Sequence, residues 1–150
     1  MSHKRQSCSL VVVVEDDQGI REALQMVLES EGYEVRTAND GKEAFSLLKK
    51  LKVPCLILTD LMMPGMNGYE FIELASKTHT IASIPIVIVS SSPNESDMKV
   101  MTDSGKIKGM VKKPVNLDLL MNIVHEHCGS SPARQHTKKA VKENGCHGLL

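Results

Sequence analysis

Short, unbroken runs of branched aliphatic residues recur along this chain of 150 residues. The clearest runs lie at residues 10–14, 55–58 and 84–89, and weaker runs lie at 33–37 and 109–111. A strand with one buried face alternates apolar and polar residues, so continuous runs indicate strands that are covered on both faces. The pattern is typical of a parallel sheet inside an α/β domain.

Between these runs, apolar residues repeat with the period of a helix. The repeating sets are Ile20, Leu24, Val27 and Leu28; Ala44, Leu47, Leu48 and Leu51; and Leu117, Leu120 and Val124. Each set forms one apolar stripe that we expect to face the sheet. Helix starts are predicted at Asp40, with Glu43 three residues on, and at the Ser-Pro-Asn-Glu segment 92–95. The resulting order βαβαβαβαβα predicts a right-handed, doubly wound parallel sheet whose ligands bind at the carboxyl ends of the strands.

The pattern stops at the Gly-Ser-Ser-Pro segment 129–132. We therefore expect a flexible N-terminus at 1–8, one domain at 9–128 and a flexible basic tail at 129–150. A tail of this length is too short for a helix-turn-helix module. The chain also has only two Tyr, two Phe and no Trp for base stacking, so we expect no direct nucleic acid binding.

The four cysteines form no Cys-x-x-Cys pair. Cys55 lies in an apolar run, where a thiol acts as a small hydrophobic group. We therefore expect reduced thiols in a cytoplasmic protein. The first apolar run is too short for a signal peptide, and no run approaches the length of a membrane span, so neither export nor membrane insertion is expected.

Polar residues follow each strong run at the predicted sheet edge. Glu15, Asp16 and Asp17 follow the first run, Asp60 follows the third, serines at 90–92 follow the fourth, and Lys-Lys-Pro at 112–114 follows the fifth. Carboxylates that converge in one crevice repel one another unless a hard cation such as Mg²⁺ neutralises them. A lysine and a hydroxyl opposite complete a site for phosphoryl transfer to a carboxylate, which we expect to be Asp60.

At these residues the chain resembles response regulator receiver domains. The resemblance rests on four segments in order: Val-Val-Glu-Asp-Asp at 13–17 with Arg21 downstream, Leu-Thr-Asp-Leu-Met-Met-Pro-Gly-Met-Asn-Gly-Tyr-Glu at 58–70, Pro-Ile-Val-Ile-Val-Ser at 85–90, and Val-Lys-Lys-Pro at 111–114. It covers roughly residues 9–128. It implies the flavodoxin-like receiver fold of the CheY-like superfamily, in the stand-alone single-domain form, with five helices and strand order 2-1-3-4-5.

The resemblance also assigns roles to individual residues. Asp60 matches the phosphoacceptor, Asp16 the direct Mg²⁺ ligand, and Glu15 a ligand that acts through water. The backbone carbonyl of Met62 matches the remaining protein ligand, and Mn²⁺ or Ca²⁺ can replace Mg²⁺. Ser90 matches the hydroxyl that binds a phosphoryl oxygen. Lys113 matches the lysine that pairs first with the acceptor and then with the phosphate.

Four further positions have secondary roles. Pro114 is expected to follow the lysine with a cis peptide bond. Asp17 fits a third metal ligand and a helix N-cap equally well. Ser92 is better explained by capping, although the family uses its position, like that of Met62, to tune dephosphorylation. Met110 replaces the Tyr or Phe that often couples the hydroxyl to the surface, so a purely aromatic switch is not expected.

The function implied is that of a phosphoacceptor switch. The expected phosphodonor is a histidine kinase or a histidine phosphotransfer protein, and the protein is not an enzyme beyond its own phosphorylation and slow dephosphorylation. The expected output is a changed affinity for an unknown downstream protein, or a homodimer, through the surface of the fourth helix, fifth strand and fifth helix.

Three other functions are less consistent with the sequence. An aspartate-nucleophile phosphatase needs a second acid where Met62 stands. A nucleotide- or flavin-binding domain needs a phosphate loop where Glu15, Asp16 and Asp17 would repel the ligand. A docking module without phosphorylation is favoured only by Met110.

Overall fold

The computed structural model describes residues 9–51, 53–91, 99, 105 and 107–129. These residues contain five strands and four helices: β1 (Leu10–Val14), α1 (Gln18–Ser30), β2 (Glu34–Ala38), α2 (Gly41–Leu48), β3 (Leu56–Thr59), α3 (Gly68–Lys77), β4 (Ile86–Ser90), β5 (Ile107–Lys112) and α5 (Leu117–Cys128). All five predicted strands are confirmed, with ends that shift by at most two residues. The helix predicted to begin at 92–95, residues 1–8 and the tail beyond residue 129 lie outside the described residues.

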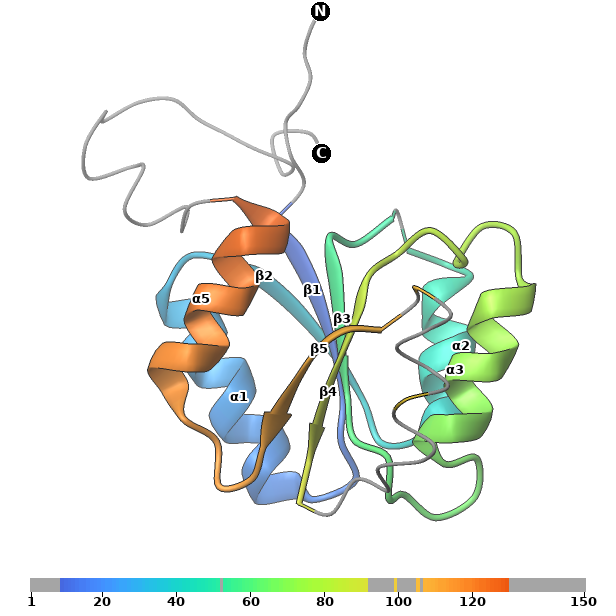
Figure 1. Cartoon of the computed structure of the whole chain (residues 1–150), viewed down its shortest axis with the longest axis horizontal. Coiled ribbons are helices and arrows are strands. Elements are labelled where there is room, and N and C mark those ends of the chain that lie inside the picture. Colours follow the sequence, from blue (N-terminus) through green and yellow to red (C-terminus); the bar gives the residue numbers. More distant parts are fainter. Residues whose placement is uncertain (1–8, 52, 92–98, 100–104, 106, 130–150) are drawn as a thin grey trace, which may run out of the picture.

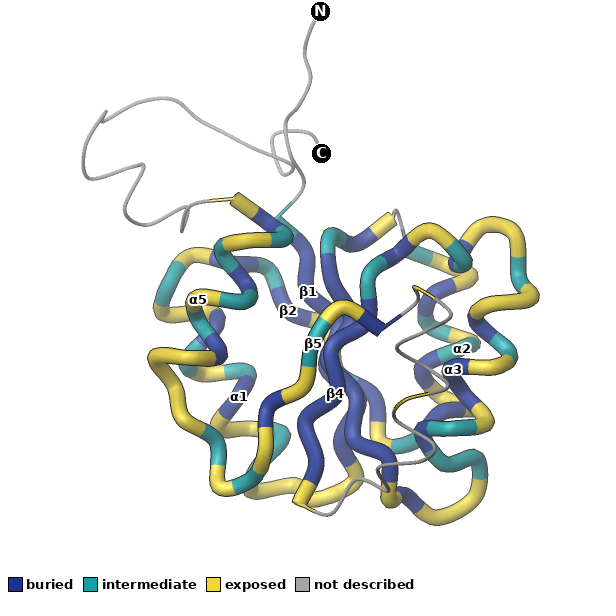
Figure 2. The backbone as a smooth tube through the Cα atoms, in the orientation of Figure 1, coloured by how far each residue is buried: buried dark blue, intermediate teal, exposed yellow. Residues whose placement is uncertain are grey.

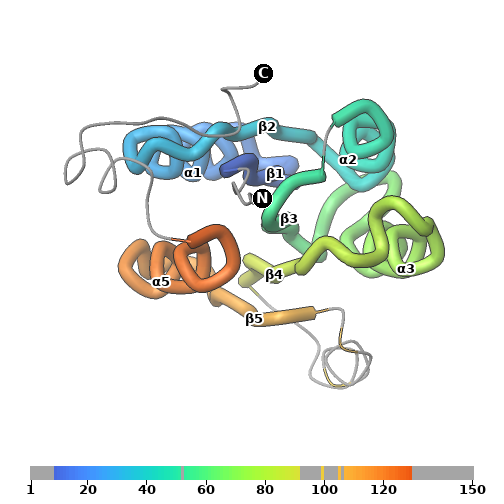
Figure 3. Tube along the Cα trace, turned by 90° about the horizontal axis from the view of Figure 1, so that it is seen from above, coloured from blue at the N-terminus to red at the C-terminus, as the bar shows by residue number. Residues whose placement is uncertain are grey.

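The five strands form one parallel sheet in the order β2-β1-β3-β4-β5. Helices α1 and α5 cover one face, and α2 and α3 cover the other (Figure 1). The end-on view separates the two helical layers (Figure 3). This is the doubly wound topology predicted from the sequence, and it brings the carboxyl ends of β1, β3, β4 and β5 to one edge of the sheet.

The inner strands β1, β3 and β4 are buried on both faces, which explains their continuous aliphatic runs, whereas the edge strands β2 and β5 include exposed residues (Figure 2). Successive side chains of β1 point to opposite faces: Val11 and Val13 join the core under α1 and α5, while Val12 and Val14 join the core under α2 and α3. No helix in the described part of the chain has the length and apolar character to cross a membrane.

Side-chain caps begin the described helices. The predicted start at Asp40 is confirmed, since its carboxylate accepts from the backbone N–H of Glu43 at 2.8 Å. Asn67 begins α3 with a full capping box that includes Glu70. The expectation that Leu117 faces the sheet is wrong: it is the first residue of α5 and 47% exposed. The predicted apolar face of α5 is correct, but only residues further along the helix contact the sheet.

Two of the four cysteines are not free thiols. Cys55 and Cys128 form a disulfide, which corrects the expectation of reduced thiols for this pair. The residues are 73 positions apart, and no short spacing motif links them. They meet because α5 runs back across the sheet and ends beside the start of β3 (Figure 1).

Candidate functional site

Asp60 follows β3, the central strand, and is only 5% exposed. Its backbone N–H donates to the carbonyl of Val14 on β1 at 3.0 Å. One carboxylate oxygen, Oδ1, accepts from the backbone N–H of Leu61 at 2.6 Å and of Met62 at 3.2 Å. The side chain of Asp60 is therefore held in one orientation by its own turn.

Glu15 and Asp16 follow β1, next to Asp60. Glu15 is 2% exposed, whereas Asp16 is exposed. The guanidinium of Arg21 ties their turn to α1, donating to the backbone carbonyls of Glu15 at 3.0 Å and of Asp16 at 3.4 Å. Asp17 caps α1 by accepting from Ile20 N–H at 2.9 Å. Capping is thus the role that the structure gives Asp17.

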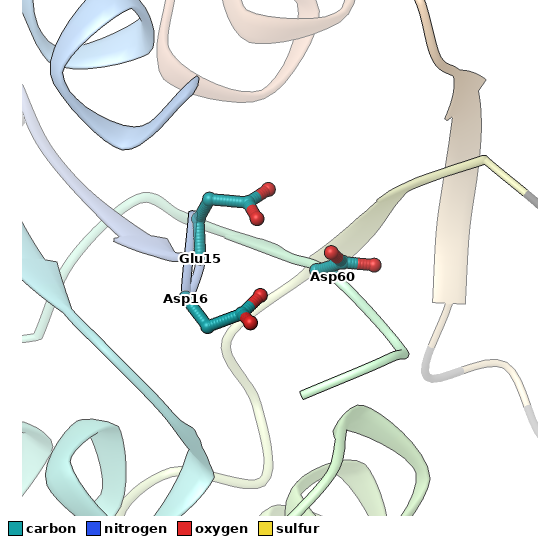
Figure 4. A group of neighbouring side chains, drawn as sticks. All are labelled: Glu15, Asp16 and Asp60. Atoms are coloured by element: carbon teal, nitrogen blue, oxygen red, sulfur yellow. The ribbon is translucent and has the colours of Figure 1, made fainter. Parts of the chain in front are cut away.

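The three carboxylates of Glu15, Asp16 and Asp60 form one acidic cluster (Figure 4). One oxygen of each lies within 4.8 Å of the others. Converging carboxylate oxygens, of which Asp16 stays open to solvent, suit a hard divalent cation that keeps several waters. The donor set therefore fits Mg²⁺. The backbone carbonyl of Met62 stays a predicted ligand.

Lys113 brings a positive charge into this acidic cluster. Its ammonium lies 2.8 Å from Glu15 Oε1 and 2.9 Å from Asp60 Oδ2, and its side chain is 15% exposed. The backbone N–H of Lys113 donates to the carbonyl of Ser90 on β4, which fixes its position. The predicted cis bond to Pro114 is confirmed, and the neighbouring Lys112 faces solvent as expected.

One ammonium is shared by two buried carboxylates, and this sets the pKa directions. Burial raises the pKa of Glu15 above its ordinary value, and the hydrogen bonds from Lys113 and the Asp17 N–H only partly offset it, while the charge of Asp60 adds to the rise. Burial alone lowers the pKa of Lys113, but its bonds to Glu15 and Asp60 outweigh burial and raise it. Two carboxylates stabilise the charged form of Lys113, whereas Glu15 shares one ammonium group with Asp60.

Ser90 ends β4 with its side chain fully buried. Its hydroxyl is one of two buried side-chain polar atoms in the described residues that have no hydrogen-bond partner. A buried hydroxyl ordinarily finds a partner, and one that lacks it is a candidate to bind something else. Met110 on β5 is 40% exposed, and Ser92 lies outside the described residues.

Gly68 is a functional position that sequence reasoning missed. Its backbone N–H donates to the carbonyl of Leu61 at 2.9 Å. A Cβ at this position would overlap the carbonyl oxygen of Asp60. Only glycine lets the start of α3 pack against the turn that holds Asp60. The capping pair Asn67 and Glu70 was the available signal, because it marks the position where this helix begins.

Known proteins resemble this chain in sequence and in fold. The family model described as the response regulator receiver domain matches residues 11–125. An "uncharacterized 14.6 kDa protein in sodA1 3'region" from Leptolyngbya boryana is 32% identical over 122 residues, which cover 81% of this chain and 92% of that protein. The DNA-binding response regulator MtrA of Mycolicibacterium smegmatis is 34% identical over 95 residues, 63% of this chain and 40% of MtrA.

Solved structures give the same result. A response regulator receiver protein from Pseudomonas putida superposes with a TM-score of 0.72 at 30% identity, covering 78% of this chain and 95% of that one. The chemotaxis protein CheY4 of Vibrio cholerae superposes with a TM-score of 0.71 at 28% identity, covering 79% and 97%. The chain therefore belongs to the response regulator receiver domains, the phosphoacceptor switches of two-component signalling.

Proposed function

We propose that this chain works as a single-domain response regulator that accepts a phosphoryl group on Asp60. The observation that carries the proposal is the environment of that carboxylate. Asp60 is buried at the end of the central strand, fixed by the Leu61 and Met62 N–H groups, and neutralised by Lys113. A carboxylate with one orientation and a nearby cation is prepared for nucleophilic attack.

The proposed cycle begins with phosphohistidine on a histidine kinase or a histidine phosphotransfer protein. A carboxylate oxygen of Asp60 forms a bond to phosphorus, and the phosphorus–nitrogen bond breaks, returning the electron pair to the donor's imidazole. Lys113 exchanges its contact with Asp60 for one with a phosphoryl oxygen. The Ser90 hydroxyl, which has no partner among the described residues, donates to a second phosphoryl oxygen.

Glu15, Asp16, Asp60 and the carbonyl of Met62 would hold Mg²⁺, for which Mn²⁺ or Ca²⁺ can substitute. When bound, the cation supplies charge neutralisation for the phosphoryl oxygens. Asp16, whose carboxylate is exposed, would be the direct ligand, and Glu15, already bonded to Lys113, would act through water.

Phosphorylation changes the contacts of this protein with another protein, and no substrate is converted to product. Inward movement of Ser90 and Lys113 toward the phosphoryl group would shift β5, on which Met110 is exposed, and the adjoining end of α5, where Leu117 and Leu119 are exposed. These apolar side chains support a protein target or a homodimer on the surface of β5 and α5, which the proposal extends to the fourth helix expected from the sequence. Apart from its own phosphorylation and slow dephosphorylation, the protein has no proposed enzymatic activity.

The remaining parts of the proposal concern the setting of the protein. The partner is a protein, and no direct contact with nucleic acid is part of this function. A cytoplasmic location follows from the proposed donor, because histidine kinases use cytoplasmic ATP. Residues 9–128 form the receiver, and 1–8 and 129–150 are proposed as flexible ends.

Intact-mass measurement after incubation with Mg²⁺ and acetyl phosphate tests the proposal. We expect a hydroxylamine-labile adduct of one phosphoryl group on the wild type and on Asp118→Asn, whose carboxylate is exposed on α5 and matched in chemistry. Asp60→Asn and chelation of the metal should abolish the adduct. An adduct that persists in Asp60→Asn, or none with acetyl phosphate and phosphoramidate alike, would refute the assignment.

A further inference from the structure

Cys55 and Cys128 lie at the end of the sheet opposite the acidic cluster. Cys55 immediately precedes β3, whose other end leads to Asp60, and Cys128 is the last residue of α5. Their Cα atoms are 5.4 Å apart, within the range that a disulfide requires without backbone movement. The fold therefore brings two cysteines from distant parts of the chain into bonding position.

The position of this pair depends on packing and not on the disulfide alone. Leu120, Val124 and Cys128 lie one helical turn apart on α5 and are buried in the same core as Leu56 of β3. The hydroxyl of Tyr33 also donates to the carbonyl of Gly129 at 3.0 Å, just beyond the helix. These contacts do not involve the sulfur atoms, so we expect the end of α5 to stay beside Cys55 when the disulfide is reduced.

Each sulfur also has a suitable environment in the reduced state. The sulfur of Cys55 lies 3.2 Å from the carbonyl oxygen of Leu10, an acceptor for a thiol proton. Cys128 is 7% exposed among apolar residues, where a thiol behaves as a small hydrophobic side chain. Cys55 is only partly buried, so a small reagent has better access to it than to Cys128. In the reduced state, the Cys55 thiol therefore has an acceptor and the Cys128 thiol has an apolar environment that suits it.

We propose that Cys55 and Cys128 are a reversible redox modification site that controls how firmly the last turn of α5 is fixed to the sheet. The oxidant is a low-molecular-weight disulfide such as oxidised glutathione. The Cys55 thiolate attacks one sulfur of the oxidant, which gives a mixed disulfide and one released thiolate. The Cys128 thiolate then attacks the Cys55 sulfur and releases the second thiolate. The two released thiolates take up the two protons of the cysteines, so the protein is oxidised by two electrons and the oxidant is reduced by two.

The site acts on the helix that directly follows Lys113. Helix α5 begins four residues after Lys113, at Leu117, and ends at Cys128. Disulfides in a reducing cytoplasm are generally transient or regulatory, so reversibility agrees with the location proposed above. The modification needs neither phosphorylation of Asp60 nor the acidic cluster, so the two proposals can be tested independently.

A redox titration of the full chain tests this proposal. The background is Cys8→Ser/Cys146→Ser, which removes the other two thiols, and the buffers are mixtures of reduced and oxidised glutathione. Free thiols are alkylated at each ratio, and tryptic digestion without reductant reports whether peptide 53–77, which contains Cys55, is linked to peptide 113–134, which contains Cys128. Hydrogen exchange of the α5 amides and the melting temperature are measured on the fully oxidised and fully reduced samples.

We expect a linked peptide pair that forms and disappears as the glutathione ratio changes. Oxidation should slow exchange in the last turn of α5 and raise Tm by roughly 10 °C. Neither effect should occur in Cys55→Ser or in Cys128→Ser. If either serine variant fails to fold, the titration of the background protein alone decides the question.

Three results would overturn the proposal. The first is complete alkylation of both cysteines at every ratio, and the second is a mixed disulfide with glutathione that never closes to the linked pair. The third is a link that persists in the folded protein under excess reduced glutathione, which would make it a permanent crosslink.

Discussion

Replacing Lys113 by methionine should destabilise the metal-free protein strongly and make it depend on a divalent cation. Methionine keeps most of the length of the side chain and removes its charge. The ammonium of Lys113 lies within 2.9 Å of a carboxylate oxygen on both Glu15 and Asp60, and these acids are only 2% and 6% exposed at their side chains. The variant therefore leaves two buried negative charges without their common cation.

The expected cost is about 3 kcal/mol, at the lower end of the range for removing one partner of a buried ion pair, because Lys113 keeps some exposure to water. For a domain of this size that cost corresponds to a fall in Tm of roughly 10 °C. Bound Mg²⁺ neutralises the same acids, so saturating Mg²⁺ should return much of the lost stability to the variant and add less to the wild type.

The cost should also depend on pH. The raised pKa of Glu15 means that the folded protein holds this proton at pH values where the unfolded chain, with the ordinary value of 4.5, has lost it. The protonated Glu15 therefore stabilises the folded protein below pH 4.5 in full, and this contribution to the free energy of unfolding is lost as pH rises through the raised pKa. Without Lys113, its hydrogen bond and its charge no longer lower the pKa of Glu15, and only the hydrogen bond from the Asp17 N–H still does. The variant should therefore be most destabilised at pH values above the raised pKa of Glu15 and less destabilised as pH falls through it.

Denaturant and thermal unfolding, followed by circular dichroism with and without Mg²⁺, provide the assay. Lys77→Met is the matched control, because Lys77 pairs with Glu73 at 3.3 Å on an exposed face of α3 and should cost less than about 0.5 kcal/mol with no response to Mg²⁺. Equal losses in the two variants, or equal stabilisation of Lys113→Met and wild type by Mg²⁺, would refute the electrostatic reasoning.

Three further predictions follow from single contacts. Gly68→Ala should lower the free energy of unfolding by about 3 kcal/mol or more and reduce phosphorylation, because the new Cβ overlaps the Asp60 carbonyl. Gly109→Ala is the control and should be nearly neutral, because its Cβ would have no neighbour nearer than 3.8 Å. Similar Tm values for the two variants would contradict this reasoning. Ser90→Ala should leave Tm unchanged or slightly higher but slow phosphorylation by acetyl phosphate, and a large loss of Tm would show that the hydroxyl has a structural partner. Stabilisation of the wild type by Mg²⁺ should weaken as pH falls through the raised pKa of Glu15 and this carboxylate is protonated, and a Tm increment that stays constant over the whole pH range in which the protein remains folded would contradict a role for Glu15 at the metal site.

The sheet was predictable from the sequence because each strand has its own signal. The runs of β1, β3 and β4 are buried on both faces and so lack polar residues, and a parallel sheet brings their carboxyl ends together without further information. The acidic cluster was predictable for the same reason, since Glu15 and Asp16 are the first two residues after β1 and Asp60 is the first after β3. Helical periodicity fixed the face of α5 correctly but not the length over which that face is covered, which is why Leu117 was wrongly expected in the core.

Contacts between distant segments were not predictable. The overlap of Gly68 with the Asp60 carbonyl depends on how closely α3 approaches β3, and the pairing of Cys55 with Cys128 depends on where α5 ends. Neither quantity is encoded in a local pattern of residue types. A sequence shows which residue follows a strand, but packing in three dimensions decides which backbone another helix touches.

Helix α5 runs from the end of the sheet that carries the acidic cluster to the end that carries the disulfide. Its N-terminal end follows Lys113, which lies between two carboxylates, and its C-terminal end is Cys128, which is bonded to Cys55. β3 makes the same connection through the core, from Cys55 to Asp60. Because interiors are close-packed, a change that fixes one end of a helix whose apolar face is packed on the core limits the positions open to the other end. Phosphorylation at Asp60 and oxidation at Cys55 would therefore act on one element from opposite ends, so the redox state would tune the same surface of β5 and α5 that we propose phosphorylation to switch.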